Sequence, residues 1–278
     1  MKNIKMEGEN VGQKLRVVVT GACGKMGRET IRAVLADPEL ELAGAVDVQE
    51  IGRDLGEVIG SIPLGINICD DLSGLLGTGR IDVLVDFTNP QVVYNNICTA
   101  IQHQVSVVIG TTGLTENHLE SIRSEAEAAA AAVLYVPNFA IGAVLLMRLS
   151  QQVAKYMPEV EIIEMHHNQK HDAPSGTSLR TAELIIEART SGSSPGVQEY
   201  LKIPGVRGGE IEGIHIHSVR LPGLVAHQEV IFGGLGQTLT IRHDSYNRES
   251  FMPGVVLAIK AMQKLRGVVV GLENILDL

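Results

Sequence analysis

Short β-branched runs alternate with helix-like stretches over the first half of this chain. The run Leu15–Thr20 is apolar at almost every position, as in a strand that is buried on both faces. The same pattern predicts strands at Leu40–Val46, 81–87, 105–109 and 133–136, and helices at 28–36, 90–102 and 115–132. Because strands and helices that alternate at this spacing form right-handed βαβ units, we expect an α/β fold with a doubly wound, Rossmann-like parallel sheet.

The second half of the chain has a different pattern. Short β runs are separated by turns that contain Gly and Pro, which is typical of a mixed or antiparallel sheet. Strands are predicted at 160–165, 214–219, 228–232 and 238–243, and helices at 178–188 and 254–267. We therefore expect a disordered leader at 1–13, a first domain at 14–138 plus 252–278, and a second α+β domain at 139–251.

The charge balance narrows the possible partners. The 278 residues include 23 Lys and Arg against 32 Asp and Glu, a net charge of −9. A nucleic-acid or anionic membrane partner requires a basic face, so we expect neither. The sequence contains no apolar run long enough for a membrane span and no signal-peptide core. The three cysteines form no CxxC pair, which favours a reducing, cytoplasmic location and an enzyme of small metabolites.

A glycine-rich loop joins the first predicted strand to the first predicted helix. Gly21, Gly24 and Gly27 allow a tight turn and let a pyrophosphate approach the helix N-terminus. A tight turn without a ligand is the alternative, since the spacing GxxGxxG differs from the usual GxGxxG. Asp47 ends the second strand, where a carboxylate accepts hydrogen bonds from an adenosine ribose, although a solvated Asp is also common there. Together the loop and Asp47 favour a dinucleotide-binding first domain.

The choice between NADH and NADPH stays open at this point. Asp47 would repel a 2′-phosphate, and Val48 supplies no cation beside it. Lys25 and Arg28, however, place positive charge near the same rim, and Arg53 follows soon after. The sequence therefore predicts NADPH or NADH as cofactor.

Other predicted strands end in loops of small or hydroxyl residues. These are 86–88 (DFT), 110–113 (GTTG) and 136–139 (VPNF). Loops at carboxyl strand ends line the ligand site of such sheets, so we expect them to face the cofactor. Ordinary turn chemistry is the alternative for each.

The segment 164–177 (EMHHNQKHDAPSGT) is the richest in chemistry. It places three histidines and a lysine between a predicted strand and a predicted helix. The unpaired N–H groups at a helix start suit an anion. A carboxylate would be held there by the Gly176 N–H, the Thr177 hydroxyl and Lys170. The segment predicts a site for an acidic substrate.

The histidines of this segment allow more than one interpretation. His166 or His167 can exchange a proton near neutral pH. A zinc site made with His171 is an alternative, but no Cys or HExxH spacing supports it. A solvated loop is another, and Ser175 can be a plain N-cap residue. An N-cap and an anion site are compatible.

These motifs together resemble the dihydrodipicolinate reductase (4-hydroxy-tetrahydrodipicolinate reductase) family of the lysine and diaminopimelate pathways. The resemblance covers the chain from about Leu15 to its end, and the segment 164–177 is its most specific part. It implies NAD(P)H-dependent reduction of dihydrodipicolinate to tetrahydrodipicolinate, a small dicarboxylate substrate, and a homotetramer built through the second domain.

The resemblance also implies roles for individual residues. His166 is similar to the histidine that donates and accepts a proton, and Lys170 to the proton-donating lysine. The implied substrate-binding residues are His167, Lys170, Ser175, Gly176 and Thr177. The implied cofactor contacts are Gly21, Ala22, Cys23, Gly24, Lys25, Met26, Asp47, Gly110, Thr111, Thr112, Val136, Pro137, Asn138 and Phe139. No metal is implied.

The chain departs from the family pattern at Val48. Some members place Arg directly after the acidic ribose-binding residue, so with Val48 here the use of NADPH would rest on other cations.

Two rival functions are considered. One is another two-domain dehydrogenase, but the thioester-forming ones need a cysteine in the second domain, and all three cysteines lie in the first. A sugar substrate gives no reason for the carboxylate-binding residues. A sensor of NAD(H) is the other rival, and it needs no convergent His and Lys.

Overall fold

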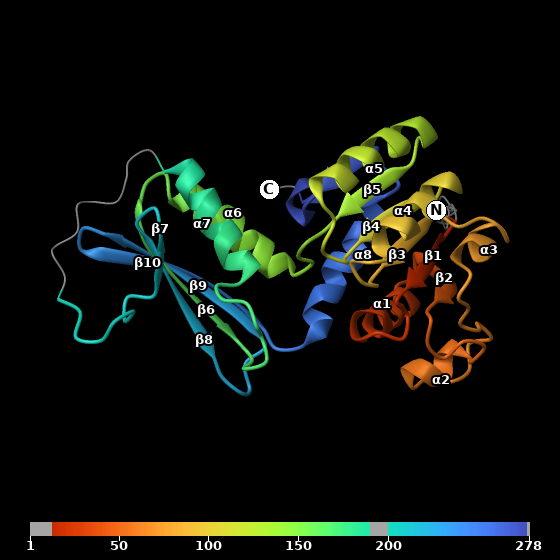
Figure 1. Ribbon diagram of the computed structural model, residues 1–278, viewed down its shortest axis with the longest axis horizontal. Coiled ribbons are helices and arrows are strands. Elements are labelled where there is room, and N and C mark those ends of the chain that lie inside the picture. Colours follow the sequence, from red (N-terminus) through yellow and green to blue (C-terminus); the bar gives the residue numbers. More distant parts are fainter. Residues whose placement is uncertain (1–12, 190–199, 277–278) are drawn as a thin grey trace, which may run out of the picture. The chain divides into compact units, whose positions relative to one another are not determined.

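The apolar runs of the first half lie side by side in the computed structural model of the chain (Figure 1), which describes residues 13–189 and 200–276. Five strands pair in parallel in the order β2-β1-β3-β4-β5, and β11 lies next to β5. The strands are β1 (Leu15–Thr20), β2 (Leu40–Val46), β3 (Val83–Asp86), β4 (Ser106–Ile109), β5 (Ala132–Tyr135) and β11 (Gly267–Val270). The predicted doubly wound parallel sheet is confirmed.

Helices bury their apolar faces against this sheet. Ile97 and Ile122, on two of the helices, pack in one core cluster with Val18, Leu84 and Val107 of the strands. The helices are α1 (Lys25–Ala36), α2 (Leu55–Ile59), α3 (Leu72–Leu76), α4 (Val93–Gln102) and α5 (Glu116–Ala129). The sequence analysis missed α2 and α3, because a five-residue helix is too short to show a 3.6-residue period.

The second half forms the expected mixed sheet. Its order is β10-β9-β6-β8-β7, with β6 parallel to β8 and the other pairs antiparallel. The strands are β6 (Glu159–His166), β7 (Gly209–Ile211), β8 (Ile214–Arg220), β9 (Ala226–Gly234) and β10 (Gln237–Ser245). The helices α6 (Ile141–Val153) and α7 (Gly176–Ala188) pack together, α6 against β9 and β10 and α7 against β6.

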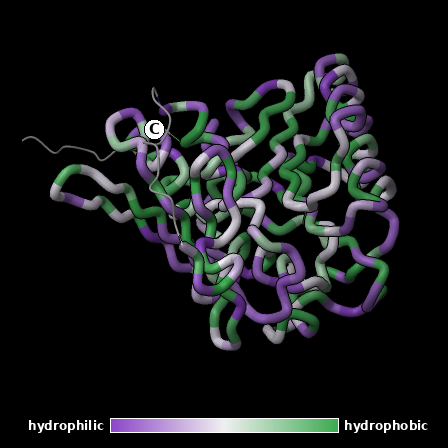
Figure 2. Tube along the Cα trace, turned by 60° about the vertical axis from the view of Figure 1, so that its left-hand side comes forward, coloured by the Kyte–Doolittle hydropathy of each residue, from purple (hydrophilic) through white to green (hydrophobic). Residues whose placement is uncertain are grey.

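The second sheet follows the two-residue period of its strands. Along β6, Val160, Ile162 and Glu164 are buried, while the residues between them are half-exposed. Hydrophobic and hydrophilic residues accordingly alternate along many parts of the chain trace (Figure 2). Glu164 differs from the other buried residues of β6 because it places a carboxylate, not an apolar side chain, at an inward position of the strand. A buried charge at such a position requires a partner.

The chain divides by its own contacts into two units. One runs to Tyr135 and includes Val256–Val269. The other comprises Val136–Val255 and the residues from Val270 onward. The predicted domain limits differ from this division by a few residues and stay a prediction. They differ most at the end of the chain, because η2 (Leu272–Ile275) packs against α6.

Two further differences concern the ends of the chain. The helix predicted at 254–267 is α8 (Met252–Ala261), and Gly267, at φ +65°, starts β11 instead. A short helix, η1 (Arg248–Phe251), precedes α8. The leader predicted at 1–13 lies outside the described residues except for its last residue. Within the described ranges, none of the helices combines the length and hydropathy needed to cross a membrane.

Candidate active site

The first unit has a cavity at the point where its strand order reverses. β1 has β2 on one side and β3 on the other, and ligands of such sheets bind at the carboxyl ends of the strands at this point. The cavity measures about 470 Å³, within the usual range for small-molecule sites. It is lined by Thr20, Gly21, Cys23, Gly24, Val46, Asp47, Val48, Gln49, Asp70, Leu72, Phe87, Thr88, Asn89, Val92 and Asn96.

Backbone contacts within the protein already require glycine at two positions of the glycine loop. Gly21 has φ +72°, and a Cβ there would overlap the carbonyl oxygen of Phe87. A Cβ at Gly27 would overlap the carbonyl oxygen of Gly21. α1 begins right after Gly24 with no side chain capping its first amides. These open amides suit a pyrophosphate, whereas the glycine spacing by itself indicates a tight turn.

Asp47 supports this loop from the end of β2. Its carboxylate accepts hydrogen bonds from the backbone N–H groups of Cys23 and Gln49, at 2.9 Å each. The Cys23 thiol donates to the Gln49 carbonyl oxygen, and burial, reinforced by the Asp47 charge, raises the pKa of that thiol to about 11. The thiol is therefore neutral at pH 7. Asp47 lines the cavity with lone pairs that a ribose hydroxyl can use.

Asp86 ties the ends of several strands together. It is fully buried and accepts hydrogen bonds from the hydroxyls of Thr20 (2.8 Å), Thr88 (2.7 Å) and Thr111 (2.6 Å). The Asn96 amide (2.8 Å) and the Thr88 N–H (3.1 Å) donate to it as well. These contacts fix the loops after β3 and β4. The Thr111 hydroxyl, expected at the cofactor, is used within the protein.

Part of the expected cofactor set meets in this cavity. Gly21, Cys23, Gly24 and Asp47 line it. Among the described residues, Ala22, Lys25, Met26 and Gly110–Thr112 do not; Ala22 is buried, Lys25 is exposed, and a Cβ at Gly110 would overlap the Phe87 ring. Val136, Pro137, Asn138 and Phe139 belong to the other unit. Their cofactor contacts stay predictions.

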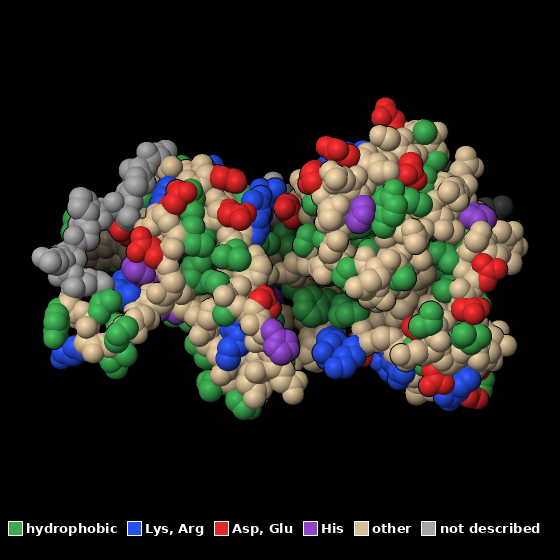
Figure 3. All heavy atoms as spheres, in the orientation of Figure 1, with side chains coloured by type: hydrophobic (Ala, Val, Ile, Leu, Met, Phe, Trp, Pro, Cys, Tyr) green, Lys and Arg blue, Asp and Glu red, His purple; other side chains and the backbone are tan. Residues whose placement is uncertain are grey.

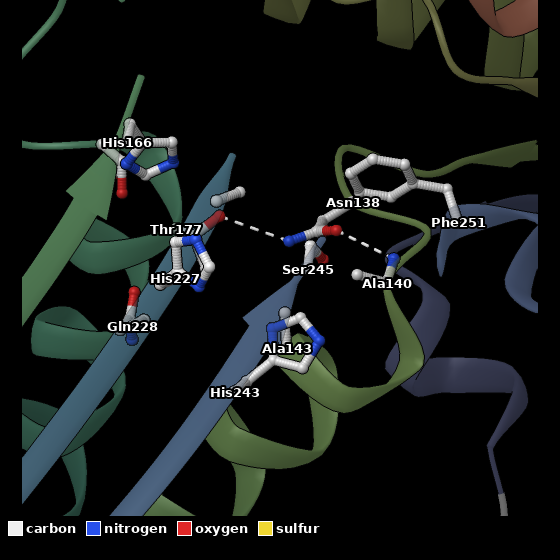
Figure 4. A pocket seen from close by; sticks show the side chains of 12 residues that line it. Asn138, Ala140, Ala143, His166, Thr177, His227, Gln228, His243, Ser245 and Phe251 are labelled. Atoms are coloured by element: carbon white, nitrogen blue, oxygen red, sulfur yellow. Dashed lines mark hydrogen bonds between the residues drawn. The ribbon is translucent and has the colours of Figure 1, made fainter. Parts of the chain in front are cut away.

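The second unit has a smaller cavity, of about 40 Å³, at the start of α7 (Figure 4). Four residues of the predicted site meet around it, namely Asn138, His166, Ser175 and Thr177. The rest of its lining is Ala140, Ala143, Ala226, His227, Gln228, His243, Ser245 and Phe251. The fold thus brings the predicted proton-transfer histidine to the helix start that was predicted to bind an anion.

The first turn of α7 has a hydroxyl group and open space that a ligand could use. Ser175 caps the helix by accepting a hydrogen bond from the Ser178 N–H at 3.2 Å. The Asn138 amide donates to the Thr177 hydroxyl oxygen at 3.3 Å, which leaves the hydroxyl proton for another acceptor. A Cβ at Gly176 would meet no atom within 4 Å, so the fold itself does not require glycine there. An anion that approaches these amides needs that space.

His166 is backed by a buried ion pair. Its Nδ1 lies 2.5 Å from Glu164 Oε2, and Arg220 donates to both Glu164 oxygens, at 2.9 and 2.7 Å. Burial alone would raise the pKa of Glu164, but the hydrogen bonds from His166 and Arg220 outweigh it and lower that pKa to about 2. Glu164 is therefore an ionised acceptor at pH 7, to which Nδ1 of His166 can donate a hydrogen bond.

Lys170 and His167 lie outside the lining of this cavity. The Lys170 Nζ lies 2.7 and 2.8 Å from the two carboxylate oxygens of Asp172, and this ion pair lowers the pKa of Asp172. His167 and His171 are exposed. Over residues 13–189 and 200–276, no three or more His, Cys, Asp or Glu side chains are arranged to hold a metal ion.

Several residues that hold the site together were not predicted from the sequence. Arg220 and Gln228 come from β8 and β9, far along the chain from the residues they bind. Gln228 accepts from the Ser178 hydroxyl at 2.9 Å and donates to the Thr181 hydroxyl at 2.7 Å, which fixes α7 on the sheet. For Glu164 there was a signal, because a charged residue at an inward strand position requires a partner.

Comparisons with known proteins identify the family to which the chain is similar. The family model "Dihydrodipicolinate reductase, N-terminus" matches residues 15–139, and "Dihydrodipicolinate reductase, C-terminus" matches residues 142–276. A 4-hydroxy-tetrahydrodipicolinate reductase of Desulfitobacterium hafniense is 52% identical over 266 residues, which cover 95% of this chain and 100% of the relative. One from Syntrophomonas wolfei is 52% identical over 264 residues, 95% and 99% of the two chains.

The fold is similar to a solved relative as well. A dipicolinate-bound dihydrodipicolinate reductase from Paenisporosarcina sp. TG-14 superposes with a TM-score of 0.86 at 44% identity. The match covers 95% of this chain and 100% of that one. That relative is solved with dipicolinate bound.

Proposed function

This chain belongs to the dihydrodipicolinate reductase family and reduces 4-hydroxy-tetrahydrodipicolinate with NAD(P)H in lysine biosynthesis, and on that premise we propose that His166 and Lys170 supply the proton of the reaction. The first unit binds the cofactor. We propose that the second unit binds the substrate carboxylates through His167, Lys170, Ser175, Gly176 and Thr177. Family membership decides against a semialdehyde or sugar dehydrogenase and against a sensor without turnover.

The cofactor fits the cavity of the first unit. The uncapped amides of α1 suit its pyrophosphate, and Asp47 suits its ribose. When bound, the reduced nicotinamide supplies a hydride to the substrate. Every other step falls to side chains and amides of the protein.

The second unit binds, orients and protonates the substrate. A substrate carboxylate accepts hydrogen bonds from the amide of Gly176 and the hydroxyl of Thr177. His166 and Lys170 act as a pair in supplying the proton, in which the Lys170 ammonium stabilises the negative charge that develops at the substrate ring nitrogen. His166 gives up the proton on Nε2 while Glu164 holds the proton on Nδ1. The observation that carries this proposal is the meeting of His166, with Glu164 behind it, and the start of α7 in one cavity.

The direct test is turnover with the unstable substrate itself. The purified chain is mixed with the freshly made product of the preceding synthase and with NADH or NADPH, and loss of nicotinamide absorbance is followed. We expect rapid oxidation that dipicolinate inhibits in competition with the substrate. Absence of oxidation with both cofactors would overturn the proposal.

We propose further that NADH is the preferred reductant. Among the described residues that line the first cavity there is no Lys or Arg, whereas two are acidic, Asp47 and Asp70. Arg53, a possible cation at this rim, is held by Glu50 at 2.6 Å and Glu57 at 3.6 Å. Lys25 and Arg28 do not line the cavity, and Arg28 Nε donates to the Cys23 carbonyl oxygen at 2.8 Å. An added 2′-phosphate would therefore meet two carboxylates and no cation among the described residues of the lining itself.

The expected preference for NADH in kcat/KM is at least about tenfold, because an unfavourable charge contact of about 1.4 kcal/mol changes affinity tenfold.

Val48 is 84% exposed, so Val48→Arg adds a cation without disturbing the core and should raise the affinity for NADPH. Val48→Met, which is long but uncharged, is the matched control. Asp47→Ala should raise KM for NADH. Calorimetry gives the dissociation constants of both cofactors, and equal constants in the unaltered enzyme would contradict the preference.

We propose that the enzyme is a homotetramer assembled through the second sheet. α6 and α7 pack on one face of this sheet. The opposite face carries half-buried Ile163, Met165, Val219 and Ile231, which can pair with a second copy. Light scattering should give the mass of four 29.8 kDa chains. Ile231→Glu should lower that mass, and a monomer in the unaltered protein would refute the proposal.

We also place the enzyme in the cytoplasm. Cys23, Cys69 and Cys98 are free thiols, as expected in a reducing compartment. Burial raises the pKa of all three. Neutral thiols of this kind are unreactive packing groups rather than nucleophiles.

A further inference from the structure

One guanidinium connects the two residues to which proton transfer is assigned. Arg220 ends β8 and lies opposite His166 in the parallel pairing of β6 with β8. Besides its two bonds to Glu164, it donates a hydrogen bond from Nη2 to the main-chain carbonyl oxygen of Asp172 at 2.8 Å. Asp172 in turn holds the Lys170 ammonium. Arg220 therefore links the carboxylate behind His166 with the loop that carries Lys170.

We propose that Glu164 and Arg220 are positioning residues for proton transfer: Glu164 holds the His166 ring with Nδ1 protonated and Nε2 left for the substrate, and Arg220 holds both Glu164 and the Asp172 loop in place. The proposal rests on the assignment of proton transfer to His166. Neither residue contacts the reacting atoms in this scheme, because each acts through His166 or Lys170.

The placement of Glu164 leaves it little freedom. Its side chain is fully buried and lies on the same face of β6 as His166, two residues away. Its two oxygens accept two hydrogen bonds from Arg220 and one from His166, and the Ser218 side chain donates to this carboxylate as well. When the Nε2–H bond breaks, its electron pair stays on Nε2 as a lone pair, and Nδ1 keeps its proton toward Glu164. The neutral ring is then ready to take a new proton from solvent at the same atom.

The other titratable groups at this cavity are not placed for the same step. His227, on β9, donates from Nδ1 to Asp244 at 2.7 Å and accepts at Nε2 from the Val225 N–H at 3.2 Å, so both of its nitrogens are engaged. Burial lowers the pKa of His243, on β10, which keeps that ring neutral at pH 7. Of the three histidines, His166 combines a carboxylate at Nδ1 with an Nε2 that is left for a ligand.

The tautomer of His166 in the unaltered enzyme is the first test. Nitrogen-15 NMR of the histidine-labelled tetramer or monomer reports which ring nitrogen carries the proton in the neutral form, and the spectrum of His166→Gln assigns the signal. We expect Nδ1–H. A neutral ring protonated at Nε2 would overturn the proposal, and this measurement needs no variant of Glu164 to fold.

Glu164→Gln is the second test, since its amide can donate to Nδ1 and reverse the tautomer. We expect kcat to fall on the order of 10²- to 10⁴-fold and the alkaline limb of its pH profile to move down by about one unit or more. The dissociation constant of NADH should not change. Glu164→Asp keeps the charge and should restore part of kcat with the original pH profile. A tautomer and a pH profile that both stay as in the unaltered enzyme would refute the proposal.

Glu161→Gln is the matched control. Glu161 lies on the same strand but on its opposite face, and it also pairs with an arginine and a histidine, Arg207 at 2.6 Å and His217 at 2.8 Å. It should leave the pH profile of kcat in place. His166→Gln separates the two proposals: if it keeps full activity, the assignment of proton transfer to His166 fails. If it is inactive while Glu164→Gln behaves like the control, the positioning role alone fails.

Discussion

We expect His166→Ala to lower kcat on the order of 10²- to 10⁴-fold, because the variant loses the group that we propose to exchange a proton with the substrate. Lys170→Ala should lower kcat as well, through lost stabilisation of charge at the substrate ring nitrogen. The affinity for NADH should be unchanged in both variants, since the cofactor cavity lies in the other unit. Steady-state kinetics with the fresh synthase product, together with calorimetry of NADH binding, check this prediction.

His171→Ala is the control for these variants. His171 is exposed, lies in the same segment and has no part in the proposed mechanism. It should keep kcat within about twofold, as surface substitutions usually do. A fall in NADH affinity together with kcat in His166→Ala would contradict the division of labour between the two units.

The second large effect is expected on stability. Asp86→Ala should lower the free energy of unfolding by about 3 kcal/mol or more, because it leaves one backbone amide and four side chains, of which Thr20 and Thr111 are buried, without their common acceptor. The chain has no tryptophan, so urea unfolding is followed by circular dichroism. The loops after β3 and β4 should loosen with it, and NADH binding should weaken.

A series of variants tests whether Asp86 stabilises the fold as the common acceptor of these hydrogen bonds, and we refer to it in that role as a hub. Thr88→Val and Thr111→Val each remove one hydroxyl that donates to Asp86 and should each cost about 1 kcal/mol. Asp86→Asn keeps the shape and one acceptor oxygen, so its cost should fall between those variants and Asp86→Ala. An Asp86→Ala variant as stable as the threonine variants would show that the hub is not needed for the fold.

Much of the fold could be predicted from local patterns. The strands Leu15–Thr20 and Leu40–Val46 were predicted to the residue, because continuous apolar runs and short connections fix a parallel sheet. α6 was missed, since its first half (IGAVLLM) is apolar all round and shows no polar face. β11 was missed, and its first residue, Gly267, was expected as the end of a helix, because four residues carry no period of their own.

The site was predictable where its residues are close in sequence. The segment 164–177 carries its own strand end and helix start, so His166, Ser175 and Thr177 were expected together and meet in one cavity. Contacts between distant residues gave no local signal. Arg220 lies 56 residues from Glu164, and Asp70 reaches the cofactor cavity from a loop whose pattern shows nothing unusual.

The glycines of the two cavities have different consequences for how sequences like this one change over time. Gly21 and Gly27 are demanded by backbone atoms of the protein itself, so a descendant that had lost catalysis would still keep them. Gly176 has open space around it and would be free to drift once no substrate had to enter. We therefore expect loss of activity to leave Gly21 and Gly27 in place, whereas a side chain at Gly176 would be compatible with the fold but not with the proposed binding of a substrate carboxylate.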